Sequence, residues 1–365
     1  MSRPDATVEA VTAEAYRIPA DAPESDGTLT WDATTIVVVR VRGGGEEGLG
    51  YTYCDAAAAR LVEDVLADVV RGTDVMAPPR AAAAMDAAVR NVGRPGLASC
   101  AISAVDVALW DLKARLLGLA LADLLGRARE GVPGYGSGGF TSLSLEALEH
   151  QLGGWAAEGF GAVKMKVGRE PDRDPARIRA ARDAIGDDVG LFIDANGACD
   201  PPGALALAEE ARAAGVAWFE EPVSSDDLPG LRLVRERTPP GMAVAAGEYG
   251  YTPWYFRRMA AAGAVDCMQA DATRCGGVSG FMAVDALCAA FILPLSAHTA
   301  PTLHAHLGVA AERVRHIEWF HDHVAVERRL FDGVPEPRDG VLTPDPDRPG
   351  LGIALRGADE LRCAA

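Results

Sequence analysis

The sequence lacks any apolar run long enough to serve as a secretion signal or a membrane span. Its seven cysteines form no CxxC pair and no regular framework, which argues against a disulfide-stabilised extracellular fold. We therefore expect free thiols and a cytoplasmic protein.

Positive charge is also scarce. The chain has 35 Lys and Arg against 52 Asp and Glu, which gives a formal net charge of −17. Nucleic acid and anionic membranes are poor partners for such a chain, because most of its surface repels phosphate groups. An anionic small molecule needs a place where lysines or a metal ion concentrate positive charge.

The bulk composition is that of an ordinary globular protein, with 49% hydrophobic and 24% charged residues. A chain of 365 residues is longer than one small domain usually is. An α/β barrel with an added module is a common architecture at this length.

A short apolar run at 216–219 ends in two adjacent carboxylates, Glu220 and Glu221, and a proline. Such a run predicts a buried strand, and a carboxylate at its end needs a cation or a donor to offset its desolvation. The same pattern recurs at Asp194 and Glu248, at intervals of 26 residues (220 − 194) and 28 residues (248 − 220). These intervals fit a repeated βα unit.

Three acidic side chains at one level of neighbouring parallel strands suit one hard cation with oxygen ligands, such as Mg²⁺. Any one of them alone is more simply interpreted as a helix cap or a surface ion pair. Three acidic side chains at matching positions of successive βα units favour a metal site.

Strand-like segments alternate with helical ones through the second part of the chain. The predicted strands end near eight positions: Gly136, Lys166, Asp194, Glu220, Glu248, Gln269, Ser296 and Glu318. Eight parallel strands with helical crossovers are the number that closes a barrel, and barrel enzymes place their active sites at the C-terminal ends of the strands. The charged residues singled out here lie at or just past such ends.

The N-terminal part has a different pattern. Strand segments lie within residues 7–53 and helical spacing covers 56–125, which predicts a separate α+β domain. A polar loop is expected at 21–32, with Trp31 inside it, and it forms either a lid over the site or a plain surface connection. The tail from residue 335, rich in Pro, Gly and Asp, is expected to pack back on this domain.

Lys164 and Lys166 lie two apart on a predicted strand, so both side chains point to the same face. Two ammonium groups inside a barrel are unfavourable unless anions surround them. The like charge of Lys164 and a nearby divalent cation should lower the pKa of Lys166 and make it available as a neutral base. Two surface lysines are the simpler interpretation of KxK alone, but this pair precedes Asp194 by one βα period (194 − 166 = 28).

Asp271 and His298 follow the next two predicted strands, so they can be neighbours. A carboxylate that accepts from one imidazole nitrogen fixes the tautomer and raises the basicity of the other nitrogen. A lone His298 is more simply a satisfied core histidine, but beside Asp271 and across from Lys166 we favour a catalytic role. Other histidines near the chain's end are expected to be structural or peripheral: His304, His306, His321 and His323.

The order of these motifs resembles that of the enolase superfamily, specifically its mandelate racemase subgroup. The likeness spans nearly the whole chain: KxK, Asp with a following Asn, Glu-Glu-Pro, Gly-Glu, Asp with Gly-Gly, His, and a final Glu. Each motif is weak alone, but seven in this order at successive strand ends are highly specific. The helix predicted at 102–113 also looks like the family's capping-domain helix.

The resemblance implies an α/β fold of a defined kind, a (β/α)7β modified TIM barrel with an N-terminal α+β capping domain completed by the C-terminal tail. We assign residues 1–127 to the capping domain, 128–330 to the barrel, and 331–365 to the segment that packs back on the capping domain. By the same analogy we expect a homo-oligomer, a dimer or an octamer.

The resemblance also implies a metal site and an acid–base pair. Mg²⁺ would be bound by three carboxylates: Asp194, Glu220 and Glu248. Lys166 and the His298–Asp271 dyad would be acid–base groups on opposite faces of a small carboxylate substrate. Enolase-superfamily enzymes are a known case of a Lys or His base with Mg²⁺, so that pairing is taken from the family.

Two further roles follow from the resemblance. Glu318 would hydrogen-bond the developing enediolate, and Lys164 would help to neutralise it. Contacts with the substrate are predicted for four side chains: Asn196, Lys164, Trp31 and Tyr53.

We therefore expect Mg²⁺-dependent removal of the proton α to a carboxylate, foremost as dehydration (β-elimination of water) of a sugar acid. Racemisation or epimerisation uses the same groups, and cycloisomerisation is a third alternative. A barrel that binds an acid sugar without turning it over is the non-catalytic alternative. Polar residues in the expected loop fit a hydroxylated substrate better than an aromatic one: Ser25, Asp26, Thr28 and Thr30.

Overall fold

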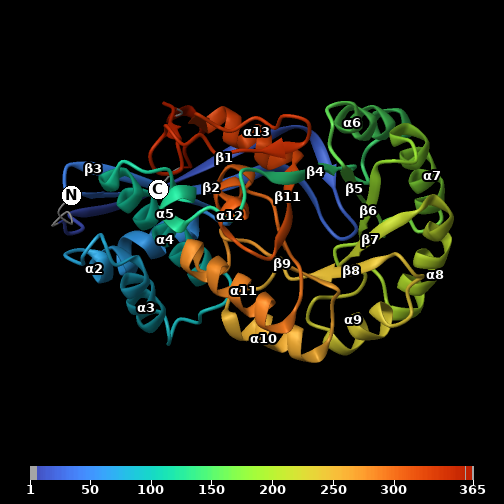
Figure 1. The fold of residues 1–365 in the computed structure, drawn as a ribbon, viewed down its shortest axis with the longest axis horizontal. Helices are drawn as coiled ribbons and strands as arrows, with labels where there is room; N and C mark the ends of the chain where they lie inside the picture. The colour runs from blue at the N-terminus through green and yellow to red at the C-terminus, as the bar shows by residue number, and fades with distance from the viewer. Residues whose placement is uncertain (1–5, 358, 364–365) are drawn as a thin grey trace.

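The computed structural model describes residues 6–357 and 359–363. A sheet with helices lies at one end of the molecule and a strand barrel ringed by helices at the other (Figure 1). The sheet is antiparallel, in the order β1 (Ala10–Ser25), β2 (Thr30–Gly43) and β3 (Glu46–Tyr53). The helices that follow are α1 (Ala57–Leu61), the π-helix η1 (Val62–Leu66), α2 (Ala67–Val70), α3 (Pro78–Ala88), α4 (Leu97–Leu117) and α5 (Leu121–Leu125).

The β-branched run in β2 is buried on both faces of the sheet. Val37 and Val39 pack with the helices of the N-terminal lobe, whereas Ile36 and Val38 belong to the main core, because successive strand residues point to opposite faces. β3 lies directly on α4: a Cβ at Gly50 would stand 2.1 Å from the carbonyl oxygen of Ala104. Glycine is therefore required for this close packing.

The barrel has eight parallel strands: β4 (Val132–Gly138), β5 (Ala162–Lys166), β6 (Gly190–Asp194), β7 (Val216–Glu220), β8 (Ala243–Ala246), β9 (Cys267–Ala270), β10 (Leu295–Ala297) and β11 (Val314–Phe320). Each strand pairs with the next, and β11 pairs with β4 through Glu318 and Tyr135. The ring is therefore closed, which confirms the predicted barrel fold.

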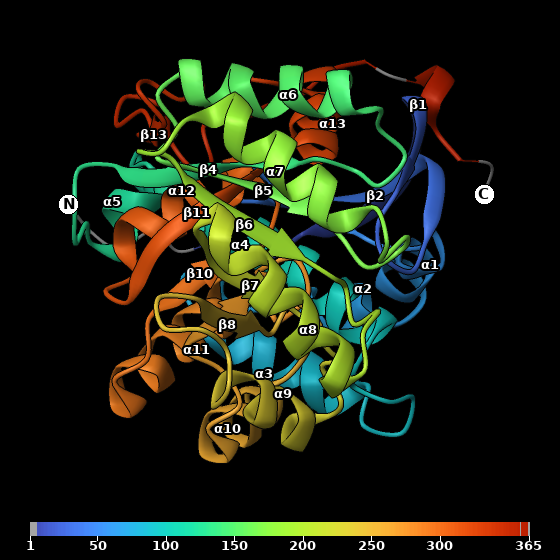
Figure 2. The same ribbon diagram turned by 90° about the vertical axis from the view of Figure 1, so that its right-hand side faces the viewer.

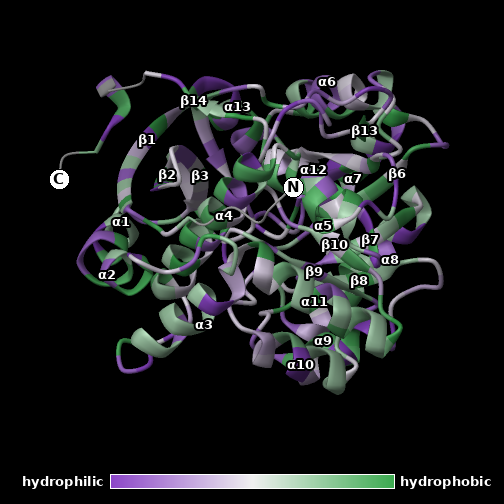
Figure 3. Cartoon of the chain, turned by 60° about the vertical axis from the view of Figure 1, so that its left-hand side comes forward, coloured by the Kyte–Doolittle hydropathy of each residue, from purple (hydrophilic) through white to green (hydrophobic). Residues whose placement is uncertain are grey.

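Helices surround the strands on the outside (Figure 2). They are α6 (Leu145–Ala157), α7 (Asp174–Ile185), α8 (Pro201–Ala211), the 3-10 helix η2 (Arg212–Ala214), α9 (Leu228–Arg235), α10 (Pro253–Ala262), α11 (Gly277–Phe291), α12 (Pro301–Ala310) and α13 (His321–Leu330). The outer helices carry both hydrophobic and hydrophilic residues (Figure 3). On α8 the buried positions are Ala204, Leu207, Ala208 and Ala211, at intervals of three, one and three, as one helical face requires. Within the described ranges, no helix is both long and apolar enough to cross a membrane.

The C-terminal tail contacts both parts of the chain. It contains β12 (Phe331–Asp332), β13 (Val341–Leu342), β14 (Ala354–Leu355) and the 3-10 helix η3 (Asp359–Leu361). β13 pairs with β4 of the barrel, while Leu351 N donates to Asp111 of α4 (2.5 Å) and Cys363 N donates to Ala15 O of β1 (2.8 Å). The domain limits 1–127, 128–330 and 331–365 remain predictions, and the first and last ranges include residues outside those described.

The predicted 21–32 loop is wrong in extent. β1 runs to Ser25 and β2 begins at Thr30, so the connection is the turn 26–29, in which Asp26 Oδ1 accepts from Thr28 N (2.6 Å) and Leu29 N (2.7 Å). Polar composition suggested a loop, but both strands continue into this segment, where Glu24 and Ser25 pair with Trp31 and Thr30. The irregularity instead takes the form of a register shift in β1 between Pro19 and Glu24.

Candidate active site

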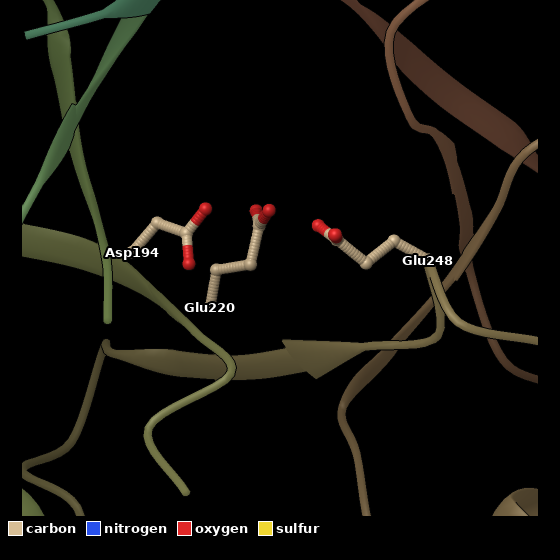
Figure 4. Close-up of side chains that lie close together, drawn as sticks. All are labelled: Asp194, Glu220 and Glu248. Carbon is tan, nitrogen blue, oxygen red and sulfur yellow. The ribbon is translucent and has the colours of Figure 1, made fainter. Parts of the chain in front are cut away.

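Three carboxylates converge at the C-terminal mouth of the barrel. Asp194 and Glu220 end β6 and β7 and are paired in register, and Glu248 lies two residues beyond β8. Each offers an oxygen within 4.8 Å of the others, and all three are buried. Figure 4 shows the three side chains pointing toward one another. Among the residues that the structure describes, this is the one such group, at the predicted positions.

A glycine brings Glu248 into this group. Gly247 has φ +137°, and a Cβ there would stand 2.1 Å from the carbonyl oxygen of Gln269. Only glycine lets the chain leave β8 so close to β9.

The donor set fits a hard divalent cation. Hydrogen bonds orient two of the carboxylates: Asn196 N donates to Asp194 (2.9 Å) and Trp218 Nε1 donates to Glu220 (2.9 Å). Glu248 Oε2 is buried and has no hydrogen-bond partner, although it lies 3.2 Å from His298 Nε2. Three oxygen ligands with one orphaned acceptor match the preference of Mg²⁺ for a few carboxylates plus water or substrate.

Two lysines on β5 supply positive charge beside these carboxylates. Lys164 is fully buried; its Nζ bonds Glu220 and lies 2.8 Å from Glu318 and 3.5 Å from Asp194. Lys166 Nζ is 2.5 Å from Asp194. Both side chains share one face, as the sequence predicts. Two of the chain's three lysines lie at this point. This concentration of lysines was a further signal of the site, beyond the motif spacing.

The expected lowering of the Lys166 pKa is not produced by the protein groups alone. Burial and the like charge of Lys164 lower it, but Asp194 raises it, and the net pKa lies above the ordinary value. A cation that neutralised Asp194 would remove the main cause of this rise. Lys166 can act as a neutral base only under that condition.

His298 and Asp271 form the predicted pair. His298 Nδ1 is 2.9 Å from Asp271 Oδ2, and Asp271 Oδ1 accepts from Thr273 N and Oγ1, both at 2.7 Å. Burial lowers the pKa of His298, but Glu248 and Asp271 raise it to about 9 overall. Burial raises the pKa of Asp271, but His298 and Arg274 together bring it below its ordinary value, so this carboxylate stays ionised and fixes the imidazole.

Lys166 and His298 flank the carboxylates from two sides of the ring. Lys166 ends β5, next to Asp194 on β6; His298 follows β10 and lies beside Glu248. Four strands separate β5 from β10 in one direction around the barrel and two in the other. A molecule bound over the three carboxylates would therefore have one of these two nitrogen groups on each side.

Glu318 is engaged by three donors. Ser137 Oγ (2.6 Å), Thr299 N (2.9 Å) and Lys164 Nζ (2.8 Å) contact its two oxygens. Burial raises its pKa, but Lys164, with His298 and Lys166, lowers it to about 2 overall. An ionised carboxylate accepts hydrogen bonds and cannot donate them, so the predicted bond to an enediolate requires Glu318 to gain a proton. That role stays a prediction.

Of the predicted substrate contacts other than Lys164, Asn196 lies nearest the carboxylates. It has φ +48°, and its Oδ1 is buried without a hydrogen-bond partner. Trp31 Nε1 donates to Glu24 (2.9 Å) and Asp322 (2.8 Å). Its polar atom is therefore already occupied by protein groups.

Tyr53 is buried at the junction between the N-terminal lobe and the barrel. Its hydroxyl lies 3.4 Å from Glu327, and its ring stacks on His323 at 3.4 Å between centroids. His304 and His306 accept from the backbone N–H groups of Ala272 and Ala122. Contacts of Asn196, Trp31 and Tyr53 with a substrate stay predictions.

The β1–β2 turn reaches this mouth of the barrel. Arg169, just past β5, donates to the carbonyl oxygens of Asp26 (2.9 Å) and Leu29 (2.6 Å). A Cβ at Gly27 would stand 2.4 Å from the carbonyl oxygen of Ala195. The turn therefore lies directly on the loop after β6, next to Asp194.

Two residues for which the sequence predicted no role also lie beside the carboxylates. Glu221 is 1% exposed, has φ +37°, and its Oε1 has no hydrogen-bond partner. Arg274 lies against Glu248 and Asp271. In the sequence, Glu221 is the second Glu of Glu-Glu-Pro, and Arg274 lies between Asp271 and the following Gly-Gly. Neither position has a distinctive spacing that would have predicted a role in the site.

Comparison with known proteins decides the family. Residues 9–126 match the model "Mandelate racemase / muconate lactonizing enzyme, N-terminal domain", and residues 147–359 match "Enolase C-terminal domain-like". The chain belongs to the enolase superfamily, in its mandelate racemase subgroup. The predicted family is therefore confirmed.

Two curated relatives of this mandelate racemase subgroup member are enzymes that act on acid sugars. One is 3,6-anhydro-alpha-L-galactonate cycloisomerase from Streptomyces coelicolor, 34% identical over 95% of this chain and 97% of its own. The other is L-talarate/galactarate dehydratase from Salmonella typhimurium, 33% identical over 90% of this chain and 81% of its own.

Two solved structures share the whole fold. A mandelate racemase/muconate lactonizing enzyme-like protein from Rubrobacter xylanophilus has TM-score 0.96 and 55% identity and covers 98% of this chain and 100% of its own. A racemase from Streptomyces coelicolor A3(2), crystallised with bound magnesium, has TM-score 0.92 and 30% identity, with coverage of 98% and 100%.

Proposed function

We propose that this protein is a Mg²⁺-dependent enzyme that removes the proton α to the carboxylate of a sugar acid and eliminates water from it. The observation that carries the proposal is the buried carboxylate trio with Lys166 on one side and the His298–Asp271 dyad on the other. Both curated relatives act on acid sugars, one of them as a dehydratase.

The ion would be held by Asp194, Glu220 and Glu248. When bound, Mg²⁺ supplies positive charge that acidifies the proton α to a carboxylate. Buried charges and dipoles act strongly at such a site because water is excluded from it. Lys164, fully buried between Glu220 and Glu318, would add fixed positive charge on the same side.

Proton transfer then falls to the two flanking groups. One of Lys166 and His298 takes the α-proton, and the electron pair of the broken C–H bond enters the enediolate. That pair then forms the Cα–Cβ double bond as the Cβ–O bond breaks, and the opposite group gives a proton to the departing hydroxyl, which leaves as water. The enol product becomes a 2-keto-3-deoxy acid. Asp271 keeps His298 oriented throughout.

Proton transfer between the two faces of one carbon is the second candidate. Racemisation or epimerisation would use the same Lys166 and His298, and similarity to a magnesium-bound racemase favours retaining it. Cycloisomerisation, in which a ring C–O bond is made or broken as well, is a third candidate, and similarity to a cycloisomerase favours retaining it. A cytoplasmic location and a homo-oligomeric state also stay predictions. Size-exclusion chromatography with light scattering would measure the oligomeric state.

An activity screen tests the proposal. Aldonic, uronic and aldaric acids are incubated with the protein and Mg²⁺ in D₂O. Dehydration gives a 2-keto-3-deoxy acid detected as its semicarbazone, whereas epimerisation gives α-deuteration and a change of optical rotation without that signal. Binding without α-deuteration or turnover across the panel would contradict the proposal and favour a non-catalytic barrel.

A further inference from the structure

Arg274 is a cation that the proposed mechanism does not use. It follows β9, and its side chain is about one-fifth exposed (19%). Its Nη1 donates to the carbonyl oxygen of Glu248 (3.2 Å) and lies 3.5 Å from Glu248 Oε1; its Nε lies 3.5 Å from Asp271 Oδ2. One guanidinium therefore touches the third carboxylate of the cation site and the carboxylate of the dyad.

Arg274, Glu248, His298 and Asp271 form a closed cycle of contacts. Asp271 contacts Nδ1 of His298 at 2.9 Å, Glu248 lies 3.2 Å from Nε2, and Arg274 closes the circle between the two carboxylates. Glu248 thus stands between two cationic or potentially cationic side chains. If Glu248 turned fully toward His298, the cation site would lose one of its three carboxylate ligands. His298 would then have no ring nitrogen free for a substrate.

We propose that Arg274 is a positioning residue that holds Glu248 toward the cation site and Asp271 toward His298. The inference rests on the proposed function, in which Glu248 is a cation ligand. The rigid fork of a guanidinium suits this task, because separate N–H groups can face two carboxylates at once, whereas an ammonium is a single point.

The backbone of Arg274 has a different duty. Ser99 Oγ of α4 lies 2.7 Å from the carbonyl oxygens of both Arg274 and Tyr251. Its single O–H can donate to either of them, and so it ties the barrel loop to the N-terminal lobe. A substitution at Arg274 leaves that carbonyl in place. Side-chain function can therefore be tested without removing this attachment.

Three explanations of Arg274 give different Mg²⁺ affinities in Arg274→Met. If the side chain positions Glu248, the Kd for Mg²⁺ rises at least fivefold. If it acts only as a nearby positive charge, its loss tightens Mg²⁺ binding, because like charges repel. If it only fills space, the affinity does not change.

The experiment is titration calorimetry of Mg²⁺ into the full chain, with circular dichroism to verify folding. Arg235→Met is the matched control, since Arg235 bonds Asp266 (2.7 Å) on the outside of the barrel, and its Kd should stay within twofold of wild type. In Arg274→Lys the Kd for Mg²⁺ should rise at least threefold, because one ammonium cannot hold both carboxylates. This variant replaces Arg274→Met if the methionine variant does not fold.

An affinity equal to or tighter than wild type in the folded Arg274 variants would overturn the inference. The proposed function fails differently: an inactive protein that still binds Mg²⁺ contradicts that function alone, while wild-type Mg²⁺ affinity in Arg274→Met contradicts this inference alone.

Discussion

Replacing Lys164 by methionine should destabilise the protein in the absence of Mg²⁺ and make it more responsive to Mg²⁺. Methionine fills most of the same volume but removes the cation from a fully buried position next to Glu220, Glu318 and Asp194. Removing one partner of a buried ion pair costs about 3–5 kcal/mol, because the remaining charge is left uncompensated. For a chain of this size that corresponds to a fall in Tm of about 4–7 °C.

Mg²⁺ should restore part of the loss. A divalent cation among Asp194, Glu220 and Glu248 replaces the charge that Lys164 supplied, and a ligand that binds only the folded state raises stability by mass action. The Mg²⁺-induced rise in Tm should therefore be larger in Lys164→Met than in wild type.

Calorimetric melting with EDTA and then with excess Mg²⁺ measures both effects. Lys113→Met is the matched control, since Lys113 lies on α4 with its Nζ 4.7 Å from the Trp110 ring, away from the carboxylates. The reasoning is refuted if Lys164→Met melts with wild type in EDTA, or if Mg²⁺ raises its Tm no more than that of wild type.

Three further predictions follow from the same contacts. Lys166→Ala and His298→Asn should each reduce turnover of any acid-sugar substrate at least a thousandfold while Mg²⁺ still binds in calorimetry; substantial turnover in both variants would contradict their roles. Gly247→Ala should lose more than about 2 kcal/mol of unfolding free energy, since its Cβ would meet Gln269 O at 2.1 Å, whereas Gly93→Ala, also at positive φ but in open space, should lose less. Burial raises the pKa of Glu327 to about 7, although hydrogen bonds from Thr302 and Tyr51 lower it in part. The folded state therefore favours the protonated carboxyl, whose contribution to stability is present below about pH 4.5 and is lost as pH rises to about 7. Urea unfolding should show Glu327→Gln gaining stability relative to wild type over that interval, and a parallel pH dependence of the two proteins would be evidence against it.

Much of the barrel and of the site followed from spacing. Buried parallel strands read as apolar runs, and a regular interval between the carboxylates that end them places those carboxylates at one edge. Asp194, Glu220, Glu248 and the Lys164–Lys166 pair could be found in this way. His298 and Asp271 followed because they end adjacent strands.

Features set by tertiary contact could not be found in the same way. The turn 26–29 looked like part of a longer loop, because polar residues do not reveal cross-strand pairing. The pKa of Lys166 depends on how close Asp194 lies, 2.5 Å in the structure, and the spacing alone fixes only that they are neighbours. Arg274 contacts two carboxylates from a loop, where side-chain direction has no sequence period.

The most direct test of the cation site is anomalous diffraction from crystals grown with Mn²⁺ in place of Mg²⁺. The account predicts one strong peak per chain, about 2.0–2.3 Å from carboxylate oxygens of Asp194, Glu220 and Glu248, with Lys166 and His298 on opposite sides of it. A peak elsewhere, or none at saturating Mn²⁺, would contradict it.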